Sequence, residues 1–152
     1  MSGKLKLELV WWVVTAVVVS TVMFPIWRGY PEFGFRFLNV VFIVVFVTFT
    51  RYIFLLRYTF LAERQYVKIG MILFSLLITL TLIVQMNDFQ RYVSEHNLSD
   101  MLRGVVTERQ EALWGYIKTE FVLFAMGSIV ASIVLPARLM MSVWRVSNGE
   151  GV

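Results

Sequence analysis

Cysteine is absent from this chain of 152 residues, and histidine occurs once, as His96. The absence of cysteine excludes disulfides, thiolate metal sites, cysteine nucleophiles and lipid attachment to cysteine. One histidine cannot form a multi-histidine zinc site or ligate a haem from both sides. The sequence also contains no H-E-x-x-H, no G-x-S-x-G and no glycine-rich phosphate loop. We therefore expect no catalytic, metal-binding or cofactor-binding residues, and an enzyme with a recognisable motif is disfavoured.

Charged residues are also scarce, at 16% of the chain, whereas 59% is hydrophobic and the mean hydropathy is +0.73. Soluble domains average about 25% charged and 45–50% apolar residues, so this is the composition of a membrane protein. The basic residues behind the formal net charge of +4 are scattered near helix ends and form no stripe, which disfavours nucleic acid as a partner. The length suits a single domain over residues 1–152.

The apolar pattern predicts an all-helical integral membrane bundle of four transmembrane helices. The uncharged runs 9–26 and 69–87 are each long enough to span a bilayer. Pro25, followed by Gly29 and Pro31, predicts that the first helix ends near residue 27. The first run lacks a small-residue cleavage site and is interpreted as a retained span. We expect helices at about residues 7–27, 35–61, 66–94 and 107–146.

The last helix is the element around which the chain is organised. Thr107 stands three residues before Gln110, with acids in the first turn, which predicts a capping-box start. A helix of this extent is about 55–60 Å long, roughly twice the hydrocarbon core. We therefore expect the third and fourth helices to extend beyond the membrane on the non-cytoplasmic side. Leu113 and Tyr116 lie on one face of this extension and are expected to contact a partner or the third helix.

The distribution of lysine and arginine predicts that both termini are cytoplasmic. Eight of the 14 basic residues lie on the side of the termini, namely Lys4, Lys6, Arg51, Arg57, Arg64, Lys68, Arg138 and Arg145. The other side holds six basic residues and seven of the 10 acids. We expect a multi-pass protein of the plasma membrane, with the bacterial inner membrane as its compartment.

Small residues recur at intervals of four along the last helix. Gly127 pairs with Ala131, and Ser128 pairs with Ser132, on adjoining faces. Small residues at this spacing allow another helix to approach closely in a membrane. We expect these four residues to pack against a helix of the same chain or of another subunit.

A few polar residues stand close to the predicted spans. Arg51 lies nearer the hydrocarbon than the other cations, and Glu8 is the acid closest to it in depth, so the two are expected to pair. Glu120, Asp88 and Gln85 lie toward the opposite side. They are either ordinary helix-end residues facing water or the lining of a polar or ion site.

Three functions are compatible with these features. We favour an interaction, assembly or accessory subunit of a larger membrane complex, because charges within the spans are few and packing surface is extensive. Its partners would be membrane lipids, other subunits or further copies of this chain, and an extracytoplasmic protein at the projecting helix. The alternative is a small oligomeric transporter or channel that uses Glu120, Asp88, Gln85 and Arg51. The third is a membrane enzyme acting on lipids, with Glu120, Asp88 or His96 as acid or base.

Overall fold

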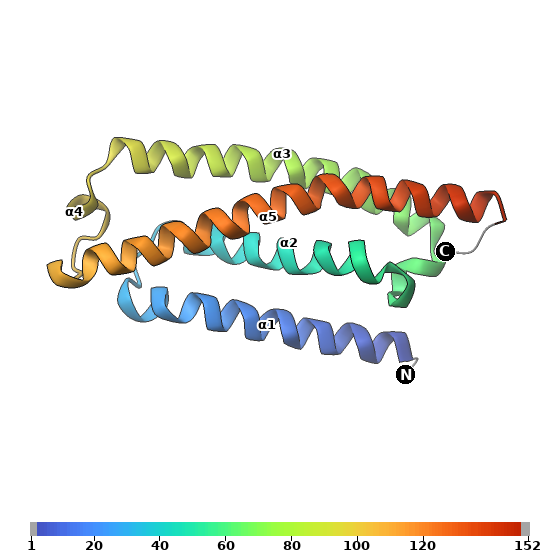
Figure 1. The fold of residues 1–152 in the computed structure, drawn as a ribbon, viewed down its shortest axis with the longest axis horizontal. Coiled ribbons are helices and arrows are strands. Elements are labelled where there is room, and N and C mark those ends of the chain that lie inside the picture. The colour runs from blue at the N-terminus through green and yellow to red at the C-terminus, as the bar shows by residue number, and fades with distance from the viewer. Residues whose placement is uncertain (1–2, 150–152) are drawn as a thin grey trace.

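The computed structural model describes residues 3–149, and all of the regular structure in that range is helical (Figure 1). The four long helices are α1 (Gly3–Gly29), α2 (Arg36–Leu55), α3 (Gln65–Glu95) and α5 (Thr107–Ser147). Two 3-10 turns, η1 (Leu56–Tyr58) and η2 (Phe60–Glu63), join α2 to α3. A short helix, α4 (Leu98–Met101), lies between α3 and α5.

All four long helices are long and apolar enough to cross a membrane, with mean hydropathies of 1.9 to 2.4 over their most apolar windows. Many of their large apolar side chains point outward instead of into the bundle. Leu77 and Leu80 of α3, for example, are each 65% exposed. Such a surface is compatible with hydrocarbon, and helices satisfy their own backbone hydrogen bonds there. These are the properties of a multi-pass helical membrane protein.

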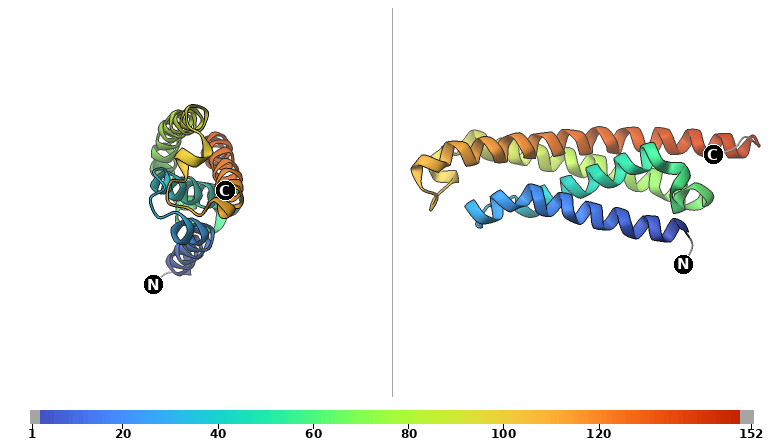
Figure 2. Two further views of the ribbon diagram at one scale, coloured as in Figure 1. Left: turned by 90° about the vertical axis from the view of Figure 1, so that its left-hand side faces the viewer. Right: turned by 60° about the horizontal axis from the view of Figure 1, so that its bottom comes forward.

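The long helices run side by side in an up-and-down order. α5 lies against both α2 and α3, whereas α1 packs outside this group, mainly on α2 (Figure 2). Both termini lie at one end of the bundle together with η1 and η2, and we call this the terminal end. The opposite end carries α4 and is called the α4 end. α5 extends past the other helices at both ends (Figure 1).

Three helix boundaries differ by two or more residues from those that the sequence predicts. α2 ends at Leu55 instead of continuing to Leu61, because Thr59 is extended, with φ −93° and ψ 162°, and its hydroxyl donates to the Leu56 carbonyl at 2.8 Å. α1 begins at Gly3 instead of near residue 7, and it runs through Pro25 to Gly29 instead of ending near residue 27. A proline removes only one backbone donor, and a membrane helix accommodates that loss by local adjustment.

The predicted capping box at the start of α5 is wrong. The N-cap residue is Val106, no side chain caps the helix, and Thr107 is already inside it. The Gln110 amide instead donates to the carbonyls of Leu102 and Val105, at 3.4 and 3.0 Å. Gln110 therefore satisfies acceptors in the loop that leads from α4, and this loop brings the chain back against α5.

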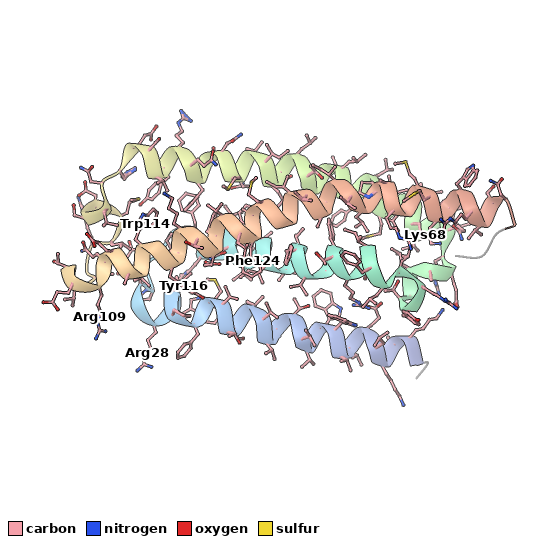
Figure 3. The ribbon with its side chains drawn as sticks, in the orientation of Figure 1. Arg28, Lys68, Arg109, Trp114, Tyr116 and Phe124 are labelled. Atoms are coloured by element: carbon pink, nitrogen blue, oxygen red, sulfur yellow. The ribbon has the colours of Figure 1, made fainter. Side chains whose placement is uncertain are left out.

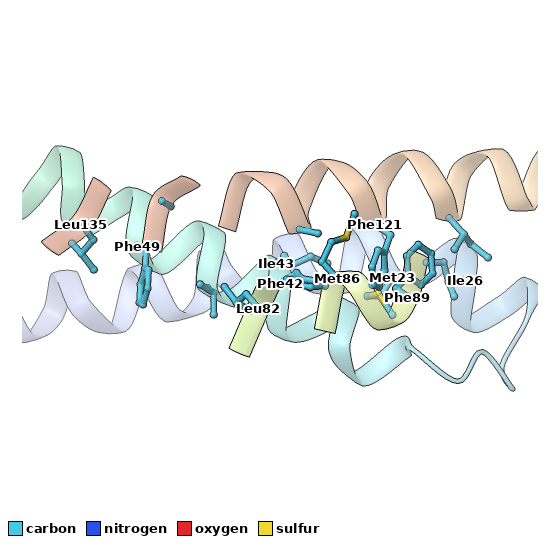
Figure 4. Close-up of a cluster of buried hydrophobic side chains, with 14 of the residues drawn as sticks. Met23, Ile26, Phe42, Ile43, Phe49, Leu82, Met86, Phe89, Phe121 and Leu135 are labelled. Carbon is cyan, nitrogen blue, oxygen red and sulfur yellow. The ribbon is translucent and has the colours of Figure 1, made fainter. Parts of the chain in front are cut away.

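Aromatic rings fill the core at the α4 end, where α2, α3 and α5 meet (Figure 4). The rings of Phe89 and Phe121 stack with centroids 3.8 Å apart, and Phe42 meets Phe121 edge-on at 5.2 Å. Phe35 meets Phe89 edge-on at 5.3 Å. Burial of such rings is among the largest apolar contributions to the stability of a core. This cluster therefore holds the three helices together around Glu120.

Candidate functional site

Glu120 is the one acidic side chain that is buried among residues 3–149. It extends from α5, is 7% exposed, and its Oε1 accepts a hydrogen bond from Nδ2 of Asn39, which is fully buried on α2. Within the described part of the chain, neither Oε2 of Glu120 nor Oδ1 of Asn39 has a hydrogen-bond partner. Two acceptor atoms therefore remain unsatisfied in one buried pair.

The surroundings of this pair are apolar. Ile117 and Phe121 flank Glu120 along α5, and Phe42 lies one turn from Asn39; all three side chains are fully buried. None of the ion pairs between described residues includes Glu120. A buried polar group without a partner costs about 1–3 kcal/mol, and more when it is charged. The pair is thus a polar point with unsatisfied acceptors in an apolar core and a candidate for binding a proton or another donor.

Glu120, Asp88 and Gln85 do not come together in the polar or ion site that was one of the two alternatives for them. Asp88 is exposed on the outer face of α3, Gln85 is half-buried, and neither hydrogen-bonds to Glu120 in residues 3–149. The partner of Glu120 is Asn39, which the sequence analysis did not single out. The available signal was an amide side chain that stands alone near the start of an otherwise apolar run.

The ion pair expected between Glu8 and Arg51 is present. Nη2 of Arg51 lies 2.6 Å from Oε1 of Glu8, and the Arg51 side chain is 4% exposed. The guanidinium carbon also lies 5.7 Å from the ring centroid of Trp11 and 5.3 Å from that of Tyr52. A carboxylate and two ring faces together stabilise the buried cation. This arrangement ties α1 to α2 near the terminal end and leaves Arg51 enclosed.

Lys68 is a second buried cation, and from the sequence it was counted among the basic residues on the side of the termini. Its Nζ donates to Oγ of Ser142 at 2.9 Å, which links α3 to α5. Serine–lysine pairs act as nucleophile and base in some hydrolases. Ser142, however, is only 1% exposed and lies within a continuous helix. The geometry is therefore that of a packing contact between α3 and α5.

The small residues of α5 pack against neighbouring helices of the same chain. A Cβ atom added to Gly127 would lie 2.7 Å from ring atoms of Phe46, so the glycine makes room for that ring. Ser128, Ala131 and Ser132 are buried. The hydroxyl of Thr79 on α3 donates to Oγ of Ser132 at 2.9 Å.

A proline explains one further contact of Ser132. Pro136 has no backbone N–H, so the carbonyl of Ser132, four residues earlier, cannot receive its helical hydrogen bond. The hydroxyl of Ser75 on α3 donates to this carbonyl at 2.6 Å. The acceptor that the proline leaves free is therefore satisfied by the neighbouring helix.

Leu113 and Tyr116, expected to contact a partner or the third helix, contact α1. A Cβ atom added to Gly29 would lie 3.1 Å from Cδ2 of Leu113, and the Tyr116 hydroxyl donates to the Val22 carbonyl at 2.7 Å. One side of the beginning of α5 thus packs against α1 and against the loop that leads from α4. Glu108, Arg109 and Glu111 on this segment are exposed.

An apolar groove of about 680 Å³ runs between α2 and α5 on the outside of the bundle. Its lining residues are Phe46, Thr50, Ile53, Phe54, Val122, Leu123, Met126, Gly127, Val130, Ala131 and Val134. Ala131 of the small-residue face lies in its floor, and Thr50 is its one lining residue with a side-chain hydroxyl. We call this surface the α2–α5 groove.

Comparison with known protein families, with curated proteins and with solved structures gives no match to this chain. Its functional assignment therefore rests on the geometry described above.

Proposed function

We propose that this protein is an interaction or accessory subunit of a larger membrane complex, and that the α2–α5 groove receives a transmembrane helix of another subunit. The groove is apolar, lies on the outside of the bundle, and has small residues in its floor. Small residues favour close helix approach in lipid, where no hydrophobic force drives association. Because the exposed residues at the start of α5 include Glu108, Arg109 and Glu111, that segment is a poor surface for an apolar transmembrane helix, and the groove is the better docking surface.

The hydroxyl of Thr50 is the observation that carries this proposal. Two threonines of these helices, Thr15 and Thr81, donate their hydroxyls to the carbonyl four residues earlier. The Thr50 hydroxyl makes no hydrogen bond within residues 3–149, although it lines an apolar groove. An unpaired hydroxyl in hydrocarbon is unfavourable, and an acceptor on a docked helix would satisfy it.

The lengths of the helices support insertion with projecting ends. α2 has 20 residues and is therefore about 30 Å long, which matches the hydrocarbon core of a bilayer. α5 has 41 residues and is roughly 60 Å long, so it extends beyond such a core. In this proposal the terminal end is cytoplasmic, following the excess of lysine and arginine there, and the bacterial inner membrane is the compartment.

A photo-crosslinking side chain at Leu123, in membranes of the native host, tests the docking surface. Leu80 on α3 is the matched control, because both leucines are 65% exposed and only Leu123 lines the groove. We expect Leu123 to give a discrete protein adduct, Leu80 to give none, and Thr50→Val to reduce the adduct. Lipid adducts alone at both positions, or an adduct of twice the mass of this chain, would contradict a partner helix in the groove.

A second candidate function is a small transporter or channel, which the Asn39–Glu120 pair favours. An acid inside a membrane bundle is costly and frequently functional. Proton or cation flux into liposomes would support this function if Glu120→Gln abolished it and Asp88→Asn, an exposed control, did not. Absence of flux for the purified protein would count against it.

A further inference from the structure

A pocket of about 490 Å³ lies at the α4 end, apart from the α2–α5 groove. It is bounded by the last turn of α1, by the loop before α5 and by the first turns of α5. Its lining residues are Pro25, Arg28, Gly29, Gly104, Val105, Val106, Arg109, Ala112, Leu113 and Tyr116. Figure 3 shows Arg28, Arg109 and Tyr116 at this end of the bundle, with both arginine side chains extending to the same side.

The charge of this pocket is of one sign. Arg28 and Arg109 are the only charged residues that line it, and they come from two different helices. Neither forms an ion pair with an acid of residues 3–149. The guanidinium of Arg28 lies 5.9 Å from the ring centroid of Phe24, which leaves its donors available. Two guanidinium groups at one pocket repel each other unless an anion lies between them, and their planar donor forks suit phosphate oxygens.

The uncapped start of α5 borders the pocket, with one acid, Glu108, in its first turn. Val105 and Val106 line the pocket immediately before α5, and no side chain caps the start of that helix. The first N–H groups of a helix lack intrahelical acceptors, and the positive end of the helix dipole lies there. Gly104, with φ of +89°, allows the tight turn that places this segment beside Arg28.

The remaining lining is apolar and adjoins the surface that would face lipid. Pro25, Ala112 and Leu113 form it, and the Tyr116 hydroxyl is already engaged by the Val22 carbonyl. A ligand that fits has an anionic oxygen group beside an apolar portion. α1 ends at Gly29, so the pocket lies where a span of this length would reach the lipid headgroups.

We propose that this pocket binds the phosphate of an anionic phospholipid between Arg28 and Arg109, with the start of the acyl chains on Pro25, Ala112 and Leu113. This site is independent of the proposed docking of a partner helix, since the two surfaces share no lining residue.

Native mass spectrometry of the full chain in detergent, with added dioleoylphosphatidylglycerol, tests the site. We expect one retained lipid, and weaker retention of zwitterionic dioleoylphosphatidylcholine, whose choline competes with the arginines for the phosphate. Arg28→Gln with Arg109→Gln should lower the affinity for phosphatidylglycerol by about tenfold or more, as expected for loss of charge-assisted hydrogen bonds. The control, Arg57→Gln with Arg145→Gln, removes the same charge at the terminal end and should leave this lipid bound.

A second pair of variants tests whether lipid binding needs the open volume of the pocket in addition to its two arginines. Ala112→Trp fills the pocket while keeping both arginines, and Ala137→Trp places the same bulk at another exposed alanine of α5. Only Ala112→Trp should reduce lipid retention. Equal retention by both tryptophan variants, or by the arginine variants and wild type, would overturn the proposal. Displacement of the lipid by inorganic phosphate alone would mean that the pocket recognises a free anion instead of a lipid.

Discussion

The Ser75 hydroxyl on α3 donates a hydrogen bond of 2.6 Å to the Ser132 carbonyl on α5. This carbonyl is the one whose helical hydrogen-bond donor is missing because residue 136 is a proline. The sequence shows the proline and the serines but not this contact, because Ser75 lies on α3 whereas Ser132 and Pro136 lie on α5. The contact allows a proline in the middle of a long helix without an unsatisfied carbonyl. It also makes α5 depend on α3 at this point.

We expect Ser75→Ala to destabilise the folded protein by about 1 kcal/mol, because the Ser132 carbonyl then loses its partner. Pro136→Ala should rescue that loss, since residue 136 regains an N–H for the same carbonyl. Unfolding in mixed detergent micelles measures both variants and their combination in a double-mutant cycle. Ser94→Ala, at an exposed serine of α3, is the control. Equal losses for Ser75→Ala with and without the proline would contradict this account.

The buried ion pair of Glu8 and Arg51 should be more sensitive to the loss of one partner than of both. Glu8→Leu alone leaves a guanidinium enclosed beside Trp11 and Tyr52 and is expected to cost about 3–5 kcal/mol. Glu8→Leu combined with Arg51→Met replaces both charges by apolar groups and should recover most of that loss. The comparison is made by thermal unfolding in detergent. A double variant as unstable as Glu8→Leu would mean that the ion pair itself, and not the isolated charge, determines stability.

The Lys4–Glu63 ion pair predicts a dependence of stability on pH. A hydrogen bond from Lys4, together with the Lys4 charge, lowers the pKa of Glu63 below its ordinary value of 4.5. The folded state therefore favours the carboxylate, and this contribution is present above pH 4.5 and is lost as the pH falls through the lowered pKa. The difference in melting temperature between wild type and Glu63→Gln should be largest near neutral pH and disappear in acid. A difference that persists unchanged at low pH would contradict this assignment.

The proposed orientation is testable because the chain has no native cysteine. Ser99→Cys lies within α4, and Ser147→Cys lies at the end of α5, so the two positions are at opposite ends of the bundle. In intact cells a membrane-impermeant thiol reagent should label Ser99→Cys and not Ser147→Cys. The reverse pattern would place the termini outside, and labelling at both sites would contradict a spanning bundle.

The sequence predicts the number and approximate positions of the long helices, because uncharged runs bounded by residues such as Lys68 and Asp88 reflect the thickness of a membrane core. It does not show which residue faces which neighbour. Lys68 appears as a boundary residue, yet its side chain is fully buried against Ser142. The pairing of Glu120 with Asn39 likewise joins positions that only the packing of α5 on α2 brings together.

Local signals were misleading where the tertiary structure uses the same side chain for another purpose. Gln110 has the spacing of a capping-box partner, but its amide satisfies two loop carbonyls instead. The apolar pattern continues past Leu55, whereas the extended backbone at Thr59 ends the helical path. Both differences arise at helix ends, where several acceptors compete for few donors.

The placement of α1 has a consequence for the order in which the protein assembles. α1 buries only Thr15, Met23 and Ile26, whereas α2, α3 and α5 share the aromatic core. We expect α2, α3 and α5 to form a stable unit first, with α1 joining it afterwards through contacts near its two ends. Residues 1–31 and 32–152, expressed as separate chains in one cell, should then reconstitute the bundle. α1, which precedes the other described helices along the chain, would then be the last of them to take its place in the fold.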